Sequence, residues 1–290
     1  MKYSLTSEIK TLLHSKLFYI SLSIITVISI IFMVQNYQSA NANINYLLNM
    51  YNEFTTTGTE FDYNEIVTPI TDYFYTYNPN LAINNSISIL IGIGLLIFPT
   101  FFSIYVGNDY KKRTIRNKII FSSLPKVIIS KYIVLILTQI IFLIIYTLIH
   151  YGLSIILYNK YLSCINLPSD IIVNNVNFNL IKNLKGIVAV FMSLIFYISL
   201  CMVISYIFKS GIAGVVMTLI INFVTLPTKF SPHNVIYYIL NKYLYISESS
   251  PVTFSLKYYF QNKNFPFILL LIYIISIFLI QLFISKIQKN

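Results

Sequence analysis

The stretch GNDYKKRTIRNKIIFSSLPKVIISK, from Gly107 to Lys131, is the most basic part of the chain. It holds seven of the twenty Lys and Arg residues and one acid, Asp109, and it lies between two long apolar runs, residues 87–106 and 132–157. Lys and Arg near the ends of membrane spans are retained on the cytoplasmic side. The pattern therefore predicts a cytoplasmic loop that joins two transmembrane helices.

The composition is that of a membrane protein. Of the 290 residues, 57% are hydrophobic and 10% are charged, which leaves no room for a large soluble domain. The net charge of +11 comes from basic residues beside apolar runs, where anionic lipid headgroups are the expected partners and nucleic acid is not. The two cysteines, Cys164 and Cys201, indicate neither a disulfide framework nor a metal site.

Six apolar runs predict an all-α, polytopic membrane protein with one domain over residues 1–290. The expected transmembrane helices cover residues 17–34, 87–106, 132–157, 187–208, 212–226 and 267–284. The fifth run is the shortest, since about 15 residues cover only about 23 Å of a hydrocarbon core about 30 Å thick. The first run is longer than the apolar region of a signal peptide, so we expect an uncleaved span although Ala40 and Ala42 form an A-x-A pattern.

Two further segments are expected at the membrane surfaces. In residues 1–16 the apolar side chains of Leu5, Ile9, Leu12 and Leu13 have helical spacing, which predicts an amphipathic interface helix or, alternatively, a helical start to the first span. Within residues 228–264, the run NVIYYILNKYLYI predicts a re-entrant or interfacial outer helix before the last span.

The distribution of charge predicts the orientation. Residues 35–80 contain no Lys or Arg and five acids, so this segment is expected outside, where the spacing of Ile44, Leu47, Leu48 and Tyr51 predicts a short helix. Most basic residues fall on the opposite side. We therefore expect a cell-membrane protein with both termini in the cytoplasm.

Several kinds of chemistry are disfavoured by the sequence. No acid lies within an expected span, whereas ion-coupled carriers commonly use intramembrane carboxylates. The chain contains neither a G-x-x-x-x-G-K-[ST] loop nor an H-E-x-x-H or G-x-S-x-G motif, so we expect no enzyme and no cofactor of its own. His150, near the outer end of the third span, is expected to be an interfacial residue.

This layout resembles the permease subunits of ABC transporters of the ABC-2 type, which have six spans, an N-terminal interface helix and a cytoplasmic loop between spans two and three. In that family the loop typically reads Glu-x-x-x-Gly-Thr, then a small residue or Pro beside a basic residue, then Lys at the start of span three. The corresponding residues here are Asp109, Arg113, Thr114, Pro125, Lys126 and Lys131. Asp109 and Arg113 depart from the family pattern.

The resemblance implies that this loop docks on a separate ATPase subunit, which would bind the ATP. The docking residues would be Asp109, Lys111, Lys112, Arg113, Thr114, Ile115, Arg116 and Lys118. Ile119 and Ile120 would complete an apolar anchor with Ile115. An alternative for the basic residues is binding of membrane lipid headgroups.

The resemblance further implies a second permease subunit, identical or related, and a path lined by spans two and five. Pro99 in span two is a candidate hinge because proline removes a helical hydrogen bond. An exporter is expected, for example of an antimicrobial peptide or a lipid-like substrate. The alternative from another class is a non-transporting immunity or scaffold protein that binds lipid or a protein partner.

Overall fold

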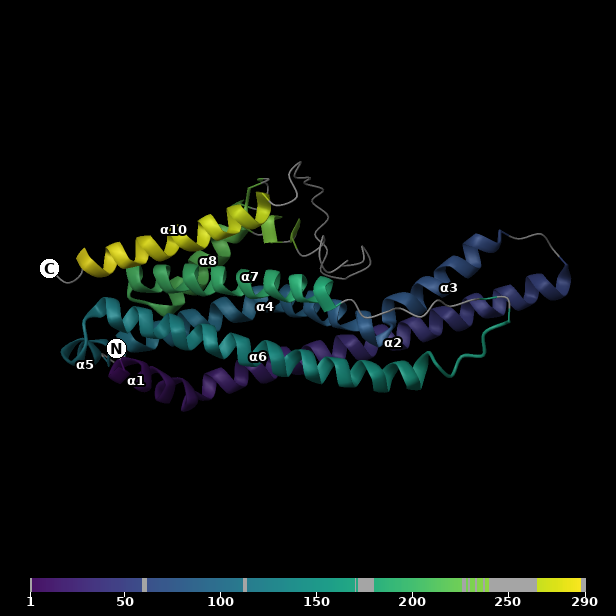
Figure 1. Cartoon of the computed structure of the whole chain (residues 1–290), viewed down its shortest axis with the longest axis horizontal. Coiled ribbons are helices and arrows are strands. Elements are labelled where there is room, and N and C mark those ends of the chain that lie inside the picture. Colours follow the sequence, from purple (N-terminus) through teal and green to yellow (C-terminus); the bar gives the residue numbers. More distant parts are fainter. Residues whose placement is uncertain are drawn as a thin grey trace.

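The structure, a computed structural model, describes residues 2–58, 62–111, 114–169, 171, 180–225, 228, 230–232, 234–236, 238–239 and 265–287. Over these residues the chain is helical, without strands, in an elongated arrangement (Figure 1). The helices are α1 Lys2–Leu13, α2 Lys16–Thr57, α3 Tyr63–Tyr77, α4 Pro79–Lys111, α5 Thr114–Phe121, α6 Leu124–Tyr161, α7 Leu180–Phe208, α8 Gly211–Thr225 and α10 Phe265–Ile287.

Over its described residues, each expected span coincides with part of a helix; residue 226 of the fifth lies outside them. Among the described residues, four segments are long and apolar enough to cross a membrane: Phe18–Thr57, Leu124–Tyr161, Gly186–Phe208 and Phe265–Ser285. Gly211–Ile221 in α8 is a shorter apolar helix, and the side chains of residues 91–96 in α4 lie outside the described part. The all-helical class and a membrane association are therefore supported, while the count of six spans stays a prediction.

The first long helix differs from expectation in its length. α2 continues without a break from Lys16 to Thr57, where the sequence indicated that the span would end at Val34 and be followed by a loop. Residues 35–57 contain neither Pro nor Gly, and they bury Ile44, Leu48 and Tyr51 along one face. The expected short helix is thus a continuation of the first span.

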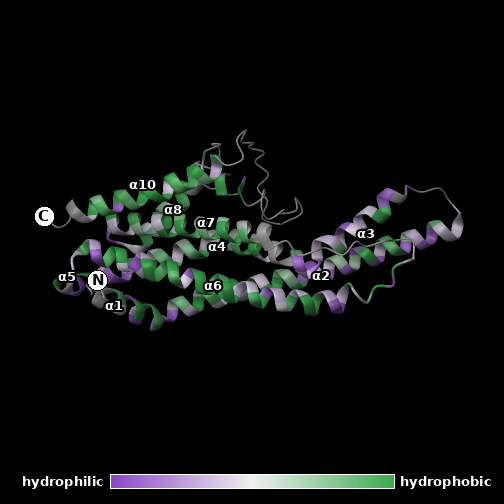
Figure 2. Cartoon of the chain, viewed as in Figure 1, coloured by the Kyte–Doolittle hydropathy of each residue, from purple (hydrophilic) through white to green (hydrophobic). Residues whose placement is uncertain are grey.

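A second hydrophobic cluster explains this extension. The distal half of α2 packs against α3 and the last turns of α6 around Tyr37, Ile44, Ile70 and Phe74, apart from the main cluster around α4, α6 and α7. Asp62 begins α3 by accepting a hydrogen bond of 2.9 Å from the amide of Asn64. The three helices therefore form a stalk beyond the apolar middle of the molecule (Figure 2).

Close helix packing lies at the other end. Gly107 in α4 and Gly211 at the start of α8 approach so closely that a Cβ at either position would overlap the backbone of the other helix. α7 and α8 are joined there by a tight turn, in which Lys209 adopts a left-handed conformation with φ 51°.

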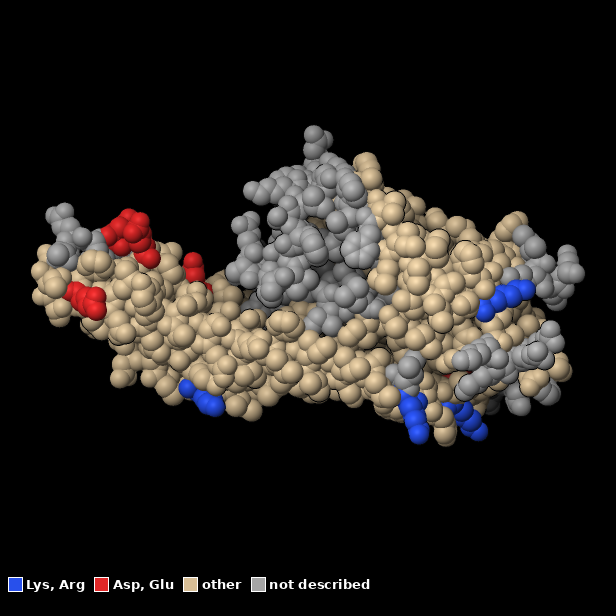
Figure 3. Space-filling model, turned by 180° about the vertical axis from the view of Figure 1, so that it is seen from behind, with Lys and Arg blue, Asp and Glu red and all other residues tan. Residues whose placement is uncertain are grey.

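The two ends of the molecule differ in charge. The N-terminus, α5 and the last turns of α10 share one end, whereas α3 and the end of α2 form the other (Figure 1). Acidic side chains lie on the surface of the α2–α3 end, and basic side chains lie mainly toward the end of the molecule that holds α5 (Figure 3). The described acids of the stalk, Glu53, Asp62, Glu65 and Asp72, are all exposed.

The expected re-entrant helix falls mostly outside the described residues. Its described positions 234–236 and 238–239 are helical, and Val235, Ile236 and Ile239 are buried in the main cluster.

Candidate functional site

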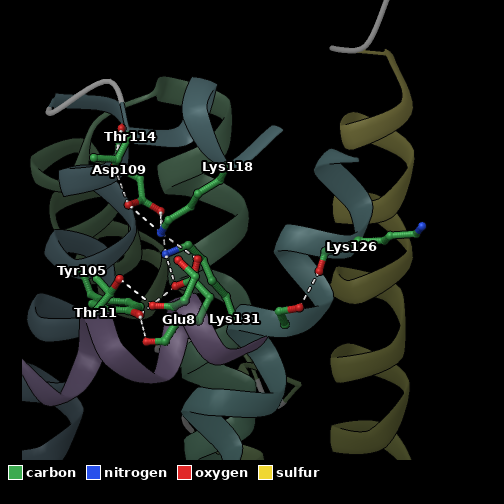
Figure 4. A network of polar contacts seen from close by, with 10 residues as sticks. Glu8, Thr11, Tyr105, Asp109, Thr114, Lys118, Lys126 and Lys131 are labelled. Carbon is green, nitrogen blue, oxygen red and sulfur yellow. Dashed lines mark hydrogen bonds and ion pairs between the residues drawn. The ribbon is translucent and has the colours of Figure 1, made fainter. Parts of the chain in front are cut away.

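Four charged side chains meet inside the protein at the end that holds α1 and α5 (Figure 4). Glu8 lies on α1, Asp109 on α4, Lys118 on α5 and Lys131 on α6. The side chains of Glu8 and Lys131 are fully buried, and those of Asp109 and Lys118 are 7% and 14% exposed. We refer to these four residues as the ion cluster.

Each carboxylate of the ion cluster contacts both ammonium groups. Lys118 Nζ lies 2.7 Å from Glu8 Oε1 and 3.0 Å from Asp109 Oδ2. Lys131 Nζ lies 3.1 Å from Glu8 Oε2 and 2.7 Å from Asp109 Oδ2. The two positive and two negative charges balance, as buried charges must if the cost of removing them from water is to be offset.

Neighbouring polar groups complete the coordination of the carboxylates. Tyr105 donates a hydrogen bond of 2.9 Å to Glu8 Oε2, and its ring centroid lies 4.3 Å from Lys131 Nζ, a cation–π geometry. Thr114, the first residue of α5, donates a hydrogen bond of 2.8 Å to Asp109 Oδ1. Burial would raise the pKa of Asp109, but Lys131 and Lys118 outweigh burial and hold this pKa below its ordinary value of 3.8.

The ion cluster joins four helices at this end of the molecule, beside the buried apolar side chains of Leu12, Val106 and Ile115. α5 is only eight residues long, and an isolated helix of that length is not stable in water. Its connections to the cluster through Lys118 and Thr114, together with the burial of Ile115, fix it against the ends of the long helices. α5 is therefore connected to α1, α4 and α6 through charge-assisted contacts.

The structure separates the expected docking residues into two groups. Asp109, Thr114 and Lys118 point into the ion cluster, and Ile115 is 8% exposed. These four side chains therefore make contacts inside the protein. Ile119 and Ile120 are 40% and 76% exposed at the end of α5. Lys112 and Arg113 lie outside the described residues, as do the side chains of Lys111, Arg116 and the candidate hinge Pro99.

Sequence reasoning missed Glu8. This acid lies three residues after Leu5 and four before Leu12, which places all three on one face of α1. Leu12 is 4% exposed and Leu5 packs against the main hydrophobic cluster, so the carboxylate is on the buried face, while Ile9 and Leu13 are exposed. The burial of Glu8 could have been predicted from its position between two apolar residues at helical spacing.

A second buried polar contact joins α2 to α6. His150 Nε2 lies 2.9 Å from Ser29 Oγ, and Nδ1 donates a hydrogen bond of 2.8 Å to the carbonyl oxygen of Tyr146. The His150 ring stacks on that of Tyr146 with centroids 3.9 Å apart, and the side chain is 1% exposed. The histidine is thus part of a helix–helix contact and is not a surface residue.

In the described part of the chain, no three His, Cys, Asp or Glu side chains are grouped so that they could hold a metal ion.

The comparisons with known proteins identify no relative: no family model, curated protein or solved structure matches the chain.

Proposed function

We propose that the chain is the transmembrane permease subunit of an ATP-driven transporter of the ABC-2 type, coupled through residues 107–131 to a separate ATPase subunit. The observation that carries the proposal is the ion cluster, because it ties a short helix at one end of the molecule to the ends of three others. Such an arrangement suits a subunit that is moved by a partner.

The face of α5 that is left open supports the proposal. Asn117, Ile119 and Ile120 are exposed, and apolar side chains in the middle of a contact contribute most to binding when a partner desolvates them. In this proposal the partner contacts Ile120, and the ion cluster passes its movement to α1, α4 and α6.

The remaining parts follow from the resemblance. Two such chains, or this chain and a related permease, assemble over two ATPase subunits, with both termini on the cytoplasmic side of the cell membrane. The segments 87–106 and 212–226 line the path, and export is the expected direction, with antimicrobial peptides and lipid-like molecules as candidate substrates.

Co-purification from the native membrane in mild detergent tests this function. We expect an ATPase to accompany the wild-type chain and to be lost from Ile120→Asp, which changes an exposed residue and so leaves the fold intact. Tyr46→Asp on the distal stalk, where Tyr46 is 65% exposed, is the control and should retain the ATPase. Wild-type protein that purifies without any ATPase would instead favour the non-transporting immunity or scaffold protein.

A further inference from the structure

The carboxylate of Glu8 is surrounded by donors that belong to other helices. Lys118 from α5 and Lys131 from α6 contact its two oxygens, and the Tyr105 hydroxyl from α4 donates to one of them. Two ammonium groups and a hydroxyl that converge on one position form an anion-binding site. Glu8 is its occupant in this structure, and it comes from a separate helix.

The charges of the site determine what could replace Glu8. Without it, Lys118 and Lys131 would face Asp109 alone, which leaves one uncompensated positive charge in a buried place. Such a charge is strongly destabilising. α1 can therefore leave the ion cluster only if an anion enters, and a singly charged phosphodiester restores the balance.

Two further buried hydroxyls belong to α4 and α7, the first of them one residue after Asp109. The hydroxyls of Tyr110 and Tyr206 are buried without a hydrogen-bond partner among the described residues. The two rings are in edge-to-face contact with centroids 5.6 Å apart, and Tyr110 directly follows Asp109 on α4. A buried donor without an acceptor is costly. A phosphate group, with more oxygens than a carboxylate, could accept from such hydroxyls.

The position of the site favours a lipid as the source of phosphate. Lys131 lies near one end of the apolar helix α6, where a headgroup would be found if this helix spans the bilayer. α1 is joined to α2 by His14 and Ser15 alone, and its exposed Ile9 and Leu13 suit contact with the membrane surface. We propose that Lys118, Lys131 and Tyr105 form a binding site for the phosphate of an anionic lipid, which Glu8 occupies as an internal competitor.

Titration of the full-length protein in maltoside detergent with short-chain phosphatidylglycerol tests the proposal. Glu8→Gln removes the competing charge while keeping the size of the side chain. We expect its apparent Kd for the lipid to be at least about tenfold lower than that of the wild type, because a neutral amide competes for the two ammonium groups less strongly than a carboxylate. Glu53→Gln removes an exposed acid on the stalk and should bind as the wild type does.

Two further variants keep the test decisive. Glu8→Asp retains the charge on a shorter side chain and should bind the lipid with intermediate affinity, which covers the case that Glu8→Gln does not fold. Glu8→Gln combined with Lys118→Gln leaves Lys131 paired with Asp109, a neutral cluster, and should lose the gain in affinity. Equal lipid binding by the Glu8 and Glu53 variants would overturn the proposal.

Inorganic phosphate distinguishes the source of the anion. If it displaces the lipid from Glu8→Gln only at concentrations far above those of phosphatidylglycerol, the site is one for a lipid headgroup. If it binds Glu8→Gln as tightly as the lipid does, the site takes free phosphate. If neither binds this variant or Glu8→Asp more tightly than the wild type, Glu8 is not a competitor and the site does not exist.

Discussion

Lys131 Nζ lies 3.1 Å from Glu8 Oε2, although 123 positions separate the two residues in the sequence. Both side chains are fully buried. The contact holds the first helix of the chain against the start of α6, and through Asp109 and Lys118 it also holds the ends of α4 and α5. The arrangement of this end thus depends on a few charged atoms.

Lys131→Met should destabilise the protein by about 3–5 kcal/mol, because it leaves two buried carboxylates facing one ammonium group. The midpoint of thermal unfolding in detergent measures the change. Lys126→Met is the matched control on the same helix, since Lys126 is exposed and points away from the cluster (Figure 4), and it should cost less than about 0.5 kcal/mol. Equal effects of the two substitutions would contradict the role of the ion cluster.

Tyr105→Phe should cost about 1.5–3 kcal/mol, since it removes a hydrogen bond to the charged Glu8 and keeps the ring beside Lys131. Chemical unfolding followed by tyrosine fluorescence or circular dichroism checks this value. Tyr46→Phe removes a hydroxyl from an exposed ring and should be nearly neutral. A neutral Tyr105→Phe would mean that the hydroxyl adds nothing to the cluster.

The ion pairs of Asp109 predict that the free energy of unfolding falls at acidic pH. Its pKa in the folded protein is held below the ordinary value of 3.8 by Lys131 and Lys118 against the effect of burial. Its contribution to the unfolding free energy is therefore complete above pH 3.8 and is lost as the pH falls through the folded pKa. The stability of the wild type should fall more steeply below about pH 4 than that of Asp109→Asn.

Unfolding midpoints measured over a pH series provide the test, with Asp72→Asn on the exposed surface of α3 as control. The control should follow the wild type. A pH dependence that is unchanged in Asp109→Asn would show that another group is responsible.

Gly107→Ala should destabilise the protein by about 1–3 kcal/mol, because the added methyl group would overlap the backbone of Gly211 and push α8 away from α4. Gly152→Ala in α6 is the control, since nothing lies within 4 Å of its Cβ position. Alanine is the better helix former by about 1 kcal/mol, so this control should be neutral or stabilising. Thermal unfolding of both variants distinguishes the close contact from a general effect of removing glycine.

Much of the fold could be predicted from the sequence, because helices long enough to cross a membrane are uninterrupted apolar runs. The end of the first long helix could not be predicted, because residues 35–57 are polar enough to suggest a loop. They stay helical because one face of this segment is buried against α3. That contact brings together segments far apart in the chain. The spacing of apolar residues within one segment does not predict such a contact.

The candidate site was predictable in part. The basic stretch contains three of the four residues of the ion cluster, but its high local charge suggested an exposed surface, whereas Lys118 and Lys131 face inward. Their partners include Glu8, more than a hundred residues away, and its role depends on how α1 packs. Only the buried face shared by Leu5, Glu8 and Leu12 pointed to it.

The uninterrupted α2 has a mechanical consequence. Its 42 residues form a rod about 63 Å long, which is separated from α1 by two residues and ends on the stalk. A tilt of about 5° at its base would carry the far tip through about 5 Å. Small rearrangements of a few charged atoms at one surface would thus be amplified at the opposite one, without any bend in between.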